Sequence, residues 1–195
     1  LEERGIKIPI RHIANSAAIM MYPETHLEMV RAGVILYGLY PSEEVDKTKL
    51  SLKPVMSVKA RVTMVKELEE NRGVSYGKAY ITNHRTRIAT VPIGYADGYT
   101  RLLSGKAQMI AKNEKVPVIG RICMDQCMID VTNVHTINAG DEVVVFGADT
   151  VTADDLAEWI GTINYEMICV IAKRIPRIYL KNGEVETVIN YLENL

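Results

Sequence analysis

The sequence has few cysteines, and their pattern argues against a disulfide-stabilised fold. Cys123, Cys127 and Cys169 are the only three among 195 residues. An odd count at scattered positions is untypical of a disulfide scaffold and fits a reducing cytoplasm. Cys123 and Cys127 are four residues apart, but no second cysteine pair or nearby histidine completes a zinc site. We therefore expect free, buried thiols, no metal site and a cytoplasmic protein.

The sequence also lacks an excess of one charge and a long apolar run. The 23 Lys and Arg residues nearly balance 24 Asp and Glu residues, which gives a formal net charge of −1. This balance gives no reason to expect nucleic acid or an anionic membrane as a partner. No run approaches the roughly 20 apolar residues of a transmembrane helix. The chain starts at Leu1 without an initiator Met or signal peptide, and we interpret this start as lying inside a longer protein.

The first part of the chain has the pattern of an α/β segment. An apolar-rich run over residues 6–13 predicts a strand that delivers Ser16 at its carboxyl end. Thr25 is followed three residues later by a glutamate, and this capping-box pattern predicts a short helix over residues 25–31. The apolar run over residues 34–40 predicts a second, buried strand. The three elements together predict a βαβ unit.

Further along, the pattern becomes typical of β-strands. Apolar and polar residues alternate over residues 55–67, which is the period of a half-buried strand. The expected buried face holds Met56, Val58, Ala60, Val62 and Met64. Turn signals separate further strand candidates, at residues 86–92, 115–119, 128–131, 142–146, 174–179 and 185–189. A helix is expected after Thr152, its N-cap, with Gly161 as its stop.

These patterns predict two domains. Residues 1–48 form an α/β remnant, and residues 49–195 form a mostly antiparallel β domain, barrel-like, with one or two short helices. Neither an internal repeat nor a low-complexity linker is present.

A first candidate site combines HIANSA at residues 12–17 with VRAGVILYG at residues 30–38. A phosphate monoester is held well by a hydroxyl group together with convergent backbone N–H groups. Ser16 offers the hydroxyl, and Gly33 permits a close backbone approach, so its N–H and that of Val34 could point at phosphate oxygens. The alternative is two ordinary strand ends with a turn glycine.

Arg31 and Tyr76 are the next candidates. Arg31 precedes Gly33 by two residues, and its commonest role would be a solvated charge or a structural ion pair. Tyr76 lies between small residues in GVSYGKAY, where it would be accessible to a ligand. Because a tyrosine has a reference pKa of about 10, a role as base needs a nearby cation or a hydrogen bond to its phenolate. The alternative for Tyr76 is cross-strand packing.

Three more segments place a tyrosine or a small-plus-polar cluster at an expected loop. They are PIGYADGYTR at residues 92–101, GRICMDQ at 120–126 and INYE at 163–166. Each is a weak signal alone.

Taken together, the segments resemble the alanine racemase family. HIANSA, MVRAGVILYGL, VSYGKAY, PIGYADGY, GRICMDQ and INYE occur in the family's order and with similar spacing, from residue 12 to residue 166. The resemblance implies an amino-terminal TIM barrel followed by a β domain. This chain would hold the last strands of the barrel and the whole β domain.

The resemblance also implies a pyridoxal 5'-phosphate (PLP) site. Ser16, Gly33 and Val34 would bind the PLP phosphate, helped by the hydroxyl of Tyr165. Arg31 would face the pyridine nitrogen, with His12 supporting it from behind. An arginine cannot accept a proton, so the ring would stay neutral and the electron sink would be weaker.

For the reaction, the resemblance implies two bases that act on opposite faces of alanine. One is Tyr76, and the other is the lysine that also holds the cofactor, which belongs to the amino-terminal half. The Met124 N–H would bind the substrate carboxylate, and Tyr95 and Tyr165 would line the entrance. The full protein would be a homodimer in which Tyr76 and Met124 serve the partner's site, and it would supply D-alanine for peptidoglycan of the cell wall. Without the cofactor lysine, the chain alone should be inactive.

Three alternatives remain open at this point. A serine racemase of the same family would share these motifs. A PLP-dependent decarboxylase of basic amino acids would share the architecture, but resembles its own relatives through a glycine-rich phosphate loop and a catalytic cysteine, where this sequence has NSA and Tyr76. A non-catalytic β-domain interaction module is the third.

Overall fold

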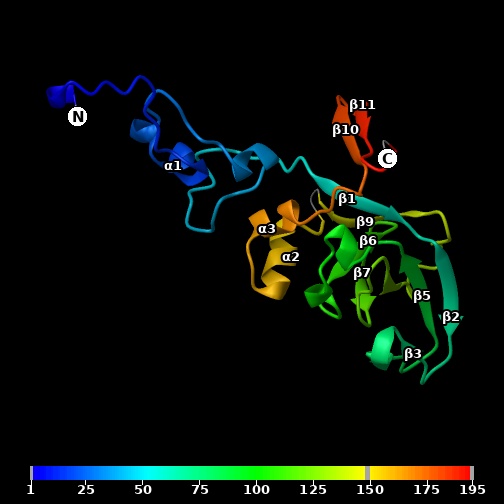
Figure 1. Ribbon diagram of the computed structural model, residues 1–195. Helices are drawn as coiled ribbons and strands as arrows, with labels where there is room; N and C mark the ends of the chain where they lie inside the picture. The colour runs from blue at the N-terminus through cyan, green and yellow to red at the C-terminus, as the bar shows by residue number, and fades with distance from the viewer. Residues whose placement is uncertain (1, 148–149, 194–195) are drawn as a thin grey trace. The chain divides into compact units, whose positions relative to one another are not determined.

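The computed structural model describes residues 2–147 and 150–193, and the chain forms two units, residues 1–56 and 57–195 (Figure 1). The second unit is built on a seven-stranded sheet with the order β1-β9-β6-β7-β8-β5-β2. Every neighbouring pair in this sheet is antiparallel. Its strands are β1 (Ser57–Arg61), β2 (Met64–Leu68), β5 (Thr86–Val91), β6 (Gln108–Ala111), β7 (Glu114–Ile119), β8 (Cys127–Asp130) and β9 (Glu142–Gly147).

The two edge strands of this sheet, β1 and β2, are consecutive in the sequence. Only Val62 and Thr63 connect them, and the chain bends there (Figure 1). The Val62 N–H donates to the carbonyl of Asp141, beside β9, whereas the Thr63 N–H donates to the carbonyl of Thr90 in β5. Since two residues span no more than about 7 Å, the sheet must curl until its edges meet. The predicted barrel-like, mostly antiparallel β domain is confirmed.

The expectation of a single strand over residues 55–67 was wrong. Alternation continues through the bend between β1 and β2, so periodicity alone could not reveal the change of partner. Val58 and Val62 are buried as expected, but Met64 is 47% exposed.

Most other predicted strands are confirmed within one to three residues at either end. The sequence analysis missed β6, which pairs with β7 across a turn at Lys112 and Asn113. Both turn residues have positive φ, 50° and 68°. Hairpin turns of this kind usually contain Asn-Gly or Asp-Gly, and that signal is absent here. Two short pairs complete the strands, β3 (Gly73–Val74) with β4 (Tyr80–Ile81) and β10 (Arg177–Lys181) with β11 (Glu184–Ile189).

Two α-helices follow β9. Helix α2 (Ala153–Ile160) begins as expected, because the Thr152 hydroxyl accepts from the Asp155 N–H and the Asp155 carboxylate accepts from the Thr152 N–H. Gly161 ends it with φ 75°. Helix α3 (Asn164–Cys169) has no side-chain hydrogen bond at its N-cap. It was therefore not singled out from the sequence.

The core of the second unit lies between the strands and α2. Phe146, Met109, Ile129 and Leu156 are fully buried there. Tyr99 is also buried, and its hydroxyl has no hydrogen-bond partner among the described residues. Burial accordingly raises the pKa of Tyr99 well above its usual value.

The three cysteines are free, but they are not uniformly buried. Cys127 is buried, and burial raises the pKa of its thiol. Cys123 is half-buried and Cys169 is exposed at the end of α3, so the expectation of buried thiols was wrong for Cys169. The face of α3 that carries Cys169 is turned away from the core.

In the first unit, the expected strand over residues 6–13 is not formed. The only bridge in this region joins His12 to Met29 in parallel, among the described residues. Ile6, Ile8 and Ile10 are exposed. A strand needs continuous backbone hydrogen bonding to a neighbouring strand. Within the described residues, only one residue of this run, His12, is paired. The predicted βαβ unit is therefore absent.

The predicted helix over residues 25–31 is also absent. Pro23–Thr25 forms a single 3₁₀ turn, η2, and the Thr25 hydroxyl donates to the Tyr22 carbonyl instead of capping a helix. Leu27 has φ 49°, which interrupts right-handed helix. The α-helix of this unit is α1 (Ser16–Met21), capped by the Asn15 side chain, which accepts from the Ala18 N–H.

The expected strand over residues 34–40 is a 3₁₀ helix, η3 (Val34–Tyr37). Gly38 ends it with φ 75°, and a Cβ there would lie 1.8 Å from the Lys53 carbonyl oxygen. The left-handed turn and the close backbone approach both require glycine. Three more 3₁₀ turns, η4 to η6, appear in the site below.

An ion pair ties the two halves of the first unit together. The Arg11 Nε donates to the Glu28 carboxylate at 2.9 Å, and the Arg11 backbone N–H donates to the same carboxylate at 3.0 Å. These hydrogen bonds, first from the side chain and then from the backbone, lower the pKa of Glu28 to about 2. Residues 11–12 and 28–29 are thereby held side by side.

We expect Tyr99→Phe to leave the melting temperature of the protein unchanged or higher. A buried hydroxyl without a partner costs roughly 1–3 kcal/mol, and phenylalanine removes it with little change of shape. Thermal unfolding measures the effect. Tyr40→Phe is the control, because the Tyr40 hydroxyl donates to the Leu50 carbonyl and its loss should lower the melting temperature. A clear destabilisation by Tyr99→Phe would mean that this hydroxyl is bonded.

We also expect Arg11→Met to raise the pKa of Glu28 from about 2 part of the way toward 4.5, because the Arg11 side chain supplies the largest contribution and the backbone N–H of residue 11 remains. A lowered pKa stabilises the folded state above pH 4.5, and this contribution is lost as the pH falls through about 2. Titration of the Glu28 carboxyl carbon by NMR measures both values. An unchanged pKa in Arg11→Met would show that the ion pair does not form.

Candidate functional site

Two neighbouring segments of the first unit form the predicted phosphate cradle. The Gly33 N–H donates to the Ser16 Oγ at 3.0 Å, and the Arg31 N–H donates to the Ala14 carbonyl at 2.8 Å. The parallel bridge between His12 and Met29 continues the same alignment. The segments around Ser16 and Gly33 thus lie together, although neither is a regular strand, and their binding of a phosphate stays a prediction.

The cradle fits a small anionic group, with one difference from expectation. A Cβ on Gly33 would lie 3.4 Å from the Ser16 Oγ, which is van der Waals contact, so a side chain here would lie directly against this hydroxyl. The Gly33 N–H is engaged by Ser16, whereas no described residue accepts a hydrogen bond from the Val34 N–H. The Ser16 hydroxyl, as donor, and the Val34 N–H are thus available to anionic oxygens.

Arg31 lies next to the cradle. One of its terminal nitrogens donates to the Ile13 carbonyl at 3.1 Å, which ties the side chain to the segment that contains Ser16. The guanidinium retains further N–H donors. His12 is exposed, and no hydrogen bond between His12 and Arg31 is found in the described part of the chain.

In the second unit, residues 120–126, here called the 120–126 loop, contact the turn that carries Tyr76. The Ser75 hydroxyl donates to the Arg121 carbonyl at 2.6 Å. A Cβ on Gly77 would lie 3.2 Å from a terminal nitrogen of Arg121, so the guanidinium borders this turn. Tyr76 begins η4 (Tyr76–Lys78) and is 72% exposed. The Arg121 guanidinium therefore lies beside the turn that carries Tyr76.

The same loop contacts the turn that carries Tyr95, η5 (Tyr95–Asp97). The Tyr95 N–H donates to the Cys123 carbonyl at 3.1 Å, and the Ala96 N–H donates to the Met124 carbonyl at 3.0 Å. A Cβ on Gly94 would lie 2.3 Å from both carbonyl oxygens. Glycine at 94 is therefore required by contact, and it lets the two segments pair closely.

Tyr76, Tyr95 and Met124 are consequently gathered around one loop, although 19 and 29 residues separate them along the chain. Tyr95 and Met124 are 44% and 54% exposed. No described residue accepts a hydrogen bond from the Met124 N–H. An exposed amide, two phenols and a nearby guanidinium can together bind a carboxylate and exchange a proton.

Tyr165 lies on α3 and is half-buried, and burial raises its pKa.

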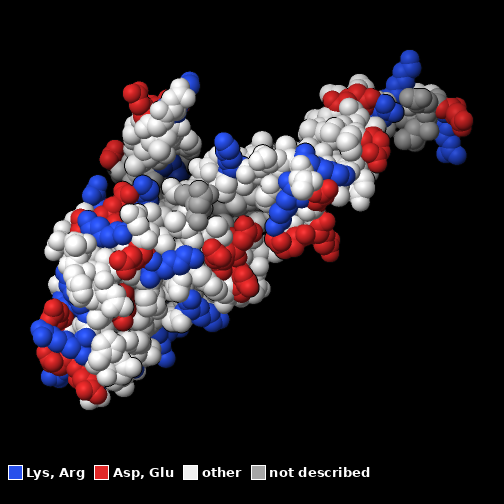
Figure 2. Space-filling model, turned by 180° about the vertical axis from the view of Figure 1, so that it is seen from behind, with Lys and Arg blue, Asp and Glu red and all other residues white. Residues whose placement is uncertain are grey.

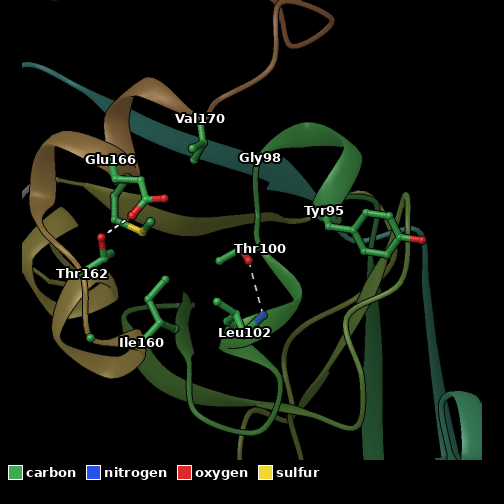
Figure 3. Close-up of a pocket in the computed structure, with 10 residues that line it drawn as sticks. Tyr95, Gly98, Thr100, Leu102, Ile160, Thr162, Glu166 and Val170 are labelled. Atoms are coloured by element: carbon green, nitrogen blue, oxygen red, sulfur yellow. Dashed lines mark hydrogen bonds between the residues drawn. The ribbon is translucent and has the colours of Figure 1, made fainter.

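A pocket of about 480 Å³ lies between η5, η6 (Arg101–Leu103) and the helices α2 and α3 (Figure 3). In Figure 3 the Tyr95 ring points away from the other lining residues, while Thr162 and Glu166 point toward each other. The Thr162 hydroxyl donates to the Glu166 carboxylate.

Sequence reasoning did not single out Arg121, Thr162 or Glu166. Arg121 and Glu166 do lie in two of the segments noted as weak signals, GRICMDQ and INYE. The sequence therefore indicated the segments of the site, but it did not indicate these individual residues.

The surface carries mixed charge. On the face drawn in Figure 2, acidic and basic side chains of the described residues are interspersed. Within the described ranges, no group of three His, Cys, Asp or Glu side chains is arranged to hold a metal ion. No described helix is long and apolar enough to cross a membrane.

Two family sequence models match the chain. The alanine racemase N-terminal domain matches residues 1–41, and the alanine racemase C-terminal domain matches residues 55–179. Among curated proteins, alanine racemase 1 of Clostridium acetobutylicum is 57% identical over 98% of this chain, and alanine racemase of Clostridium perfringens is 56% identical over 98%. The chain spans about half the length of these relatives, 50% of each.

Solved structures agree with the sequence comparison. Alanine racemase from Clostridium difficile 630 in complex with cycloserine has a TM-score of 0.95 and 48% identity, over 98% of this chain and 51% of that one. Alanine racemase from Bacillus anthracis with bound L-Ala-P has a TM-score of 0.94 and 39% identity, over 100% of this chain and 51% of that one. In sequence and in fold, this chain belongs to the alanine racemase family.

Proposed function

We propose that the full-length protein is a PLP-dependent alanine racemase that interconverts L- and D-alanine and supplies D-alanine for peptidoglycan. The observation that carries this proposal is the 57% identity to a named alanine racemase across 98% of the chain. The Ser16–Gly33 cradle and the Tyr76 turn, arranged as such an enzyme needs, support it. We also propose that the protein works in the cytoplasm, where its cysteines stay reduced.

The cradle would hold the cofactor phosphate. Ser16 would donate its hydroxyl hydrogen and Val34 its N–H, while Gly33 would orient Ser16 and keep the space open. The hydroxyl of Tyr165 would add a further donor from the second unit. Arg31 would face the pyridine nitrogen, with His12 behind it. When bound, PLP withdraws electrons from the substrate α-carbon.

Tyr76 would move the proton on one face of the substrate. Its Oη would take a proton from the α-carbon of one enantiomer, or return a proton there to form it. The Met124 N–H would donate to the substrate carboxylate, and Tyr95 with Tyr165 would line the entrance.

The second base and the cofactor attachment would come from a lysine in the half of the protein outside this chain. Residues 1–48 would then belong to the end of the PLP-binding barrel domain, and residues 49–195 to the β domain. The chain alone would not racemise alanine.

We propose further that the protein is a homodimer with shared sites. Tyr76 and Met124 are strongly exposed on their own unit, as expected of groups that complete a site elsewhere. In this arrangement they serve the partner's site, while Ser16 and Arg31 serve their own.

The direct test is an assay of purified full-length protein with PLP and L-alanine, followed by chiral chromatography. We expect D-alanine to form until the enantiomers are equal. Faster conversion of serine would indicate a serine racemase, and release of an amine would indicate a decarboxylase. Neither PLP binding nor turnover would indicate an interaction module and overturn the proposal.

We expect Tyr76→Phe in the full-length enzyme to lower kcat by roughly 10²–10⁴-fold while cofactor affinity stays nearly unchanged, because one general acid–base group is lost and no PLP contact is removed. Exchange of the α-proton with deuterium in D₂O should survive for one alanine enantiomer and collapse for the other. NMR measures both exchange rates.

Tyr80→Phe is the matched control. Tyr80 lies four residues further on and packs against Val74, Ile88 and Ile119, away from the exposed turn. Its phenylalanine variant should keep wild-type exchange for both enantiomers. Equal loss of exchange for both enantiomers in Tyr76→Phe would exclude a one-face role for Tyr76.

The shared site can be tested by mixing two inactive variants, Tyr76→Phe and one that lacks the cofactor lysine. In a mixed dimer with sites shared as proposed, one site has both bases and the other has neither, so part of the activity should return. Mass spectrometry of tagged chains must first demonstrate subunit exchange. Mixed dimers that stay as inactive as both parents would place Tyr76 in its own subunit's site.

A further inference from the structure

Arg174 joins two segments of the candidate site. Its Nε donates to the Asp97 carboxylate at 2.6 Å, and its Nη2 donates to the Asp125 carboxylate at 2.6 Å. Asp97 ends η5, the turn that begins with Tyr95, and Asp125 follows Met124 in the 120–126 loop. One planar guanidinium therefore bridges the two segments, which are 28 residues apart.

Arg174 makes two ion pairs. The pair with Asp97 is here called the inner arm, and the pair with Asp125 is called the outer arm. The Asp97 side chain is only 6% exposed, and its other oxygen accepts from the Gly94 N–H at 2.9 Å. The Asp125 side chain is 61% exposed. A buried carboxylate is costly unless it is paired, so the inner arm contributes to folding. The outer arm pairs an exposed carboxylate, which contributes little to stability, yet it restrains the residue after Met124.

Met124 is thereby held from two sides. Its carbonyl accepts from the Ala96 N–H at 3.0 Å, and the side chain of the next residue is bonded to Arg174. The Cys123 N–H donates to the Gln126 carbonyl at 2.8 Å and closes the turn. The Cys123 carbonyl, which shares a peptide plane with the Met124 N–H, accepts from the Tyr95 N–H at 3.1 Å. This bond and the contacts of the two neighbouring peptide units together restrain the direction of the Met124 N–H.

The segment that contains Arg174 is itself anchored to η5. The Ala172 N–H donates to the Asp97 carbonyl at 2.9 Å. A Cβ on Gly98, which has φ 97°, would lie 2.3 Å from the Val170 carbonyl oxygen. Arg174 thus projects from a closely packed segment and acts as a rigid support.

We propose that Arg174 is a positioning residue that aims the Met124 N–H at the substrate carboxylate through Asp125. This inference rests on the proposed racemase function. Lysine cannot replace it, because an ammonium group is a point charge without the planar fork that serves two carboxylates in fixed directions.

The test compares Arg174→Lys with Arg177→Lys in the full-length, PLP-loaded enzyme. Arg177 lies three residues further on and donates to one acceptor among the described residues, the Ile171 carbonyl, at 2.8 Å, so its bond does not need a planar fork. For Arg174→Lys we expect KM for alanine to rise about ten-fold, which corresponds to about 1.4 kcal/mol, with little change in kcat or in PLP affinity. The inhibition constant of propanoate, which retains the carboxylate and lacks the amine, should rise by the same factor.

Two features separate positioning from a merely structural role. Because the two enantiomers are equally stable, kcat/KM falls equally in both directions for any variant, so the first feature is a rise in KM at nearly constant kcat, which shows that binding is affected. Arg177→Lys should match the wild type in KM and in the propanoate constant. If Arg174→Lys lowers the melting temperature but leaves KM and the propanoate constant at wild-type values, the positioning role is overturned.

Asp125→Asn is a second variant in case Arg174→Lys does not fold. This substitution removes the charge of the exposed Asp125 carboxylate only, and we expect it to raise KM for alanine with little loss of stability. The double variant Arg174→Lys/Asp125→Asn should be no worse than the stronger single variant, because both changes break one linkage. An Asp125→Asn enzyme with wild-type KM overturns the proposal. A wild-type protein that does not racemise alanine overturns the proposed function and this inference with it.

Discussion

The connection between β1 and β2 is the constraint on which the second unit depends. The Val62 N–H forms a hydrogen bond beside β9, near one edge of the sheet, and the Thr63 N–H forms one to β5, near the other edge. Two adjacent residues therefore connect the two edges. A flat sheet of seven strands at about 4.8 Å spacing would separate its edges by almost 30 Å. The sheet is therefore curled, and its loops are brought together at the ends of the curled strands.

Curvature explains why the candidate site residues meet. Tyr76, Tyr95 and Met124 come from three segments that the sequence keeps apart, and Met124 lies in the 120–126 loop itself. The Tyr76 segment contacts this loop through the Ser75 hydroxyl, and the Tyr95 segment contacts it through backbone hydrogen bonds. The close approaches at Gly94 and Gly120 make these contacts possible. A Cβ on Gly120, which has φ 68°, would lie 2.8 Å from the Ser75 Cβ. Arg174 then adds an electrostatic link between two of the segments.

The first unit follows a different principle. Its described residues form short helices and single turns, held by the Arg11–Glu28 pair and by the hydrogen bond between Gly33 and Ser16. Parallel strands need partners on both sides and depend on burial. Isoleucines at 6, 8, 10 and 13 are exposed in this unit. Its cradle is thus formed by local hydrogen bonds and not by a sheet.

The sequence by itself determined the family, the order of the motifs and the elements whose signals are local. The α2 helix is an example, because the Thr152 cap and the Gly161 stop both lie within one short segment. The proximity of Ser16 and Gly33 was also suggested by the sequence, since both lie in motifs of recognisable spacing. Only the tertiary structure decided which strands pair, where β1 gives way to β2, and which residues surround the 120–126 loop. Arg174 shows the reason: its two carboxylate partners are 77 and 49 residues away, and no periodicity in the sequence indicates a contact that chain folding alone brings about.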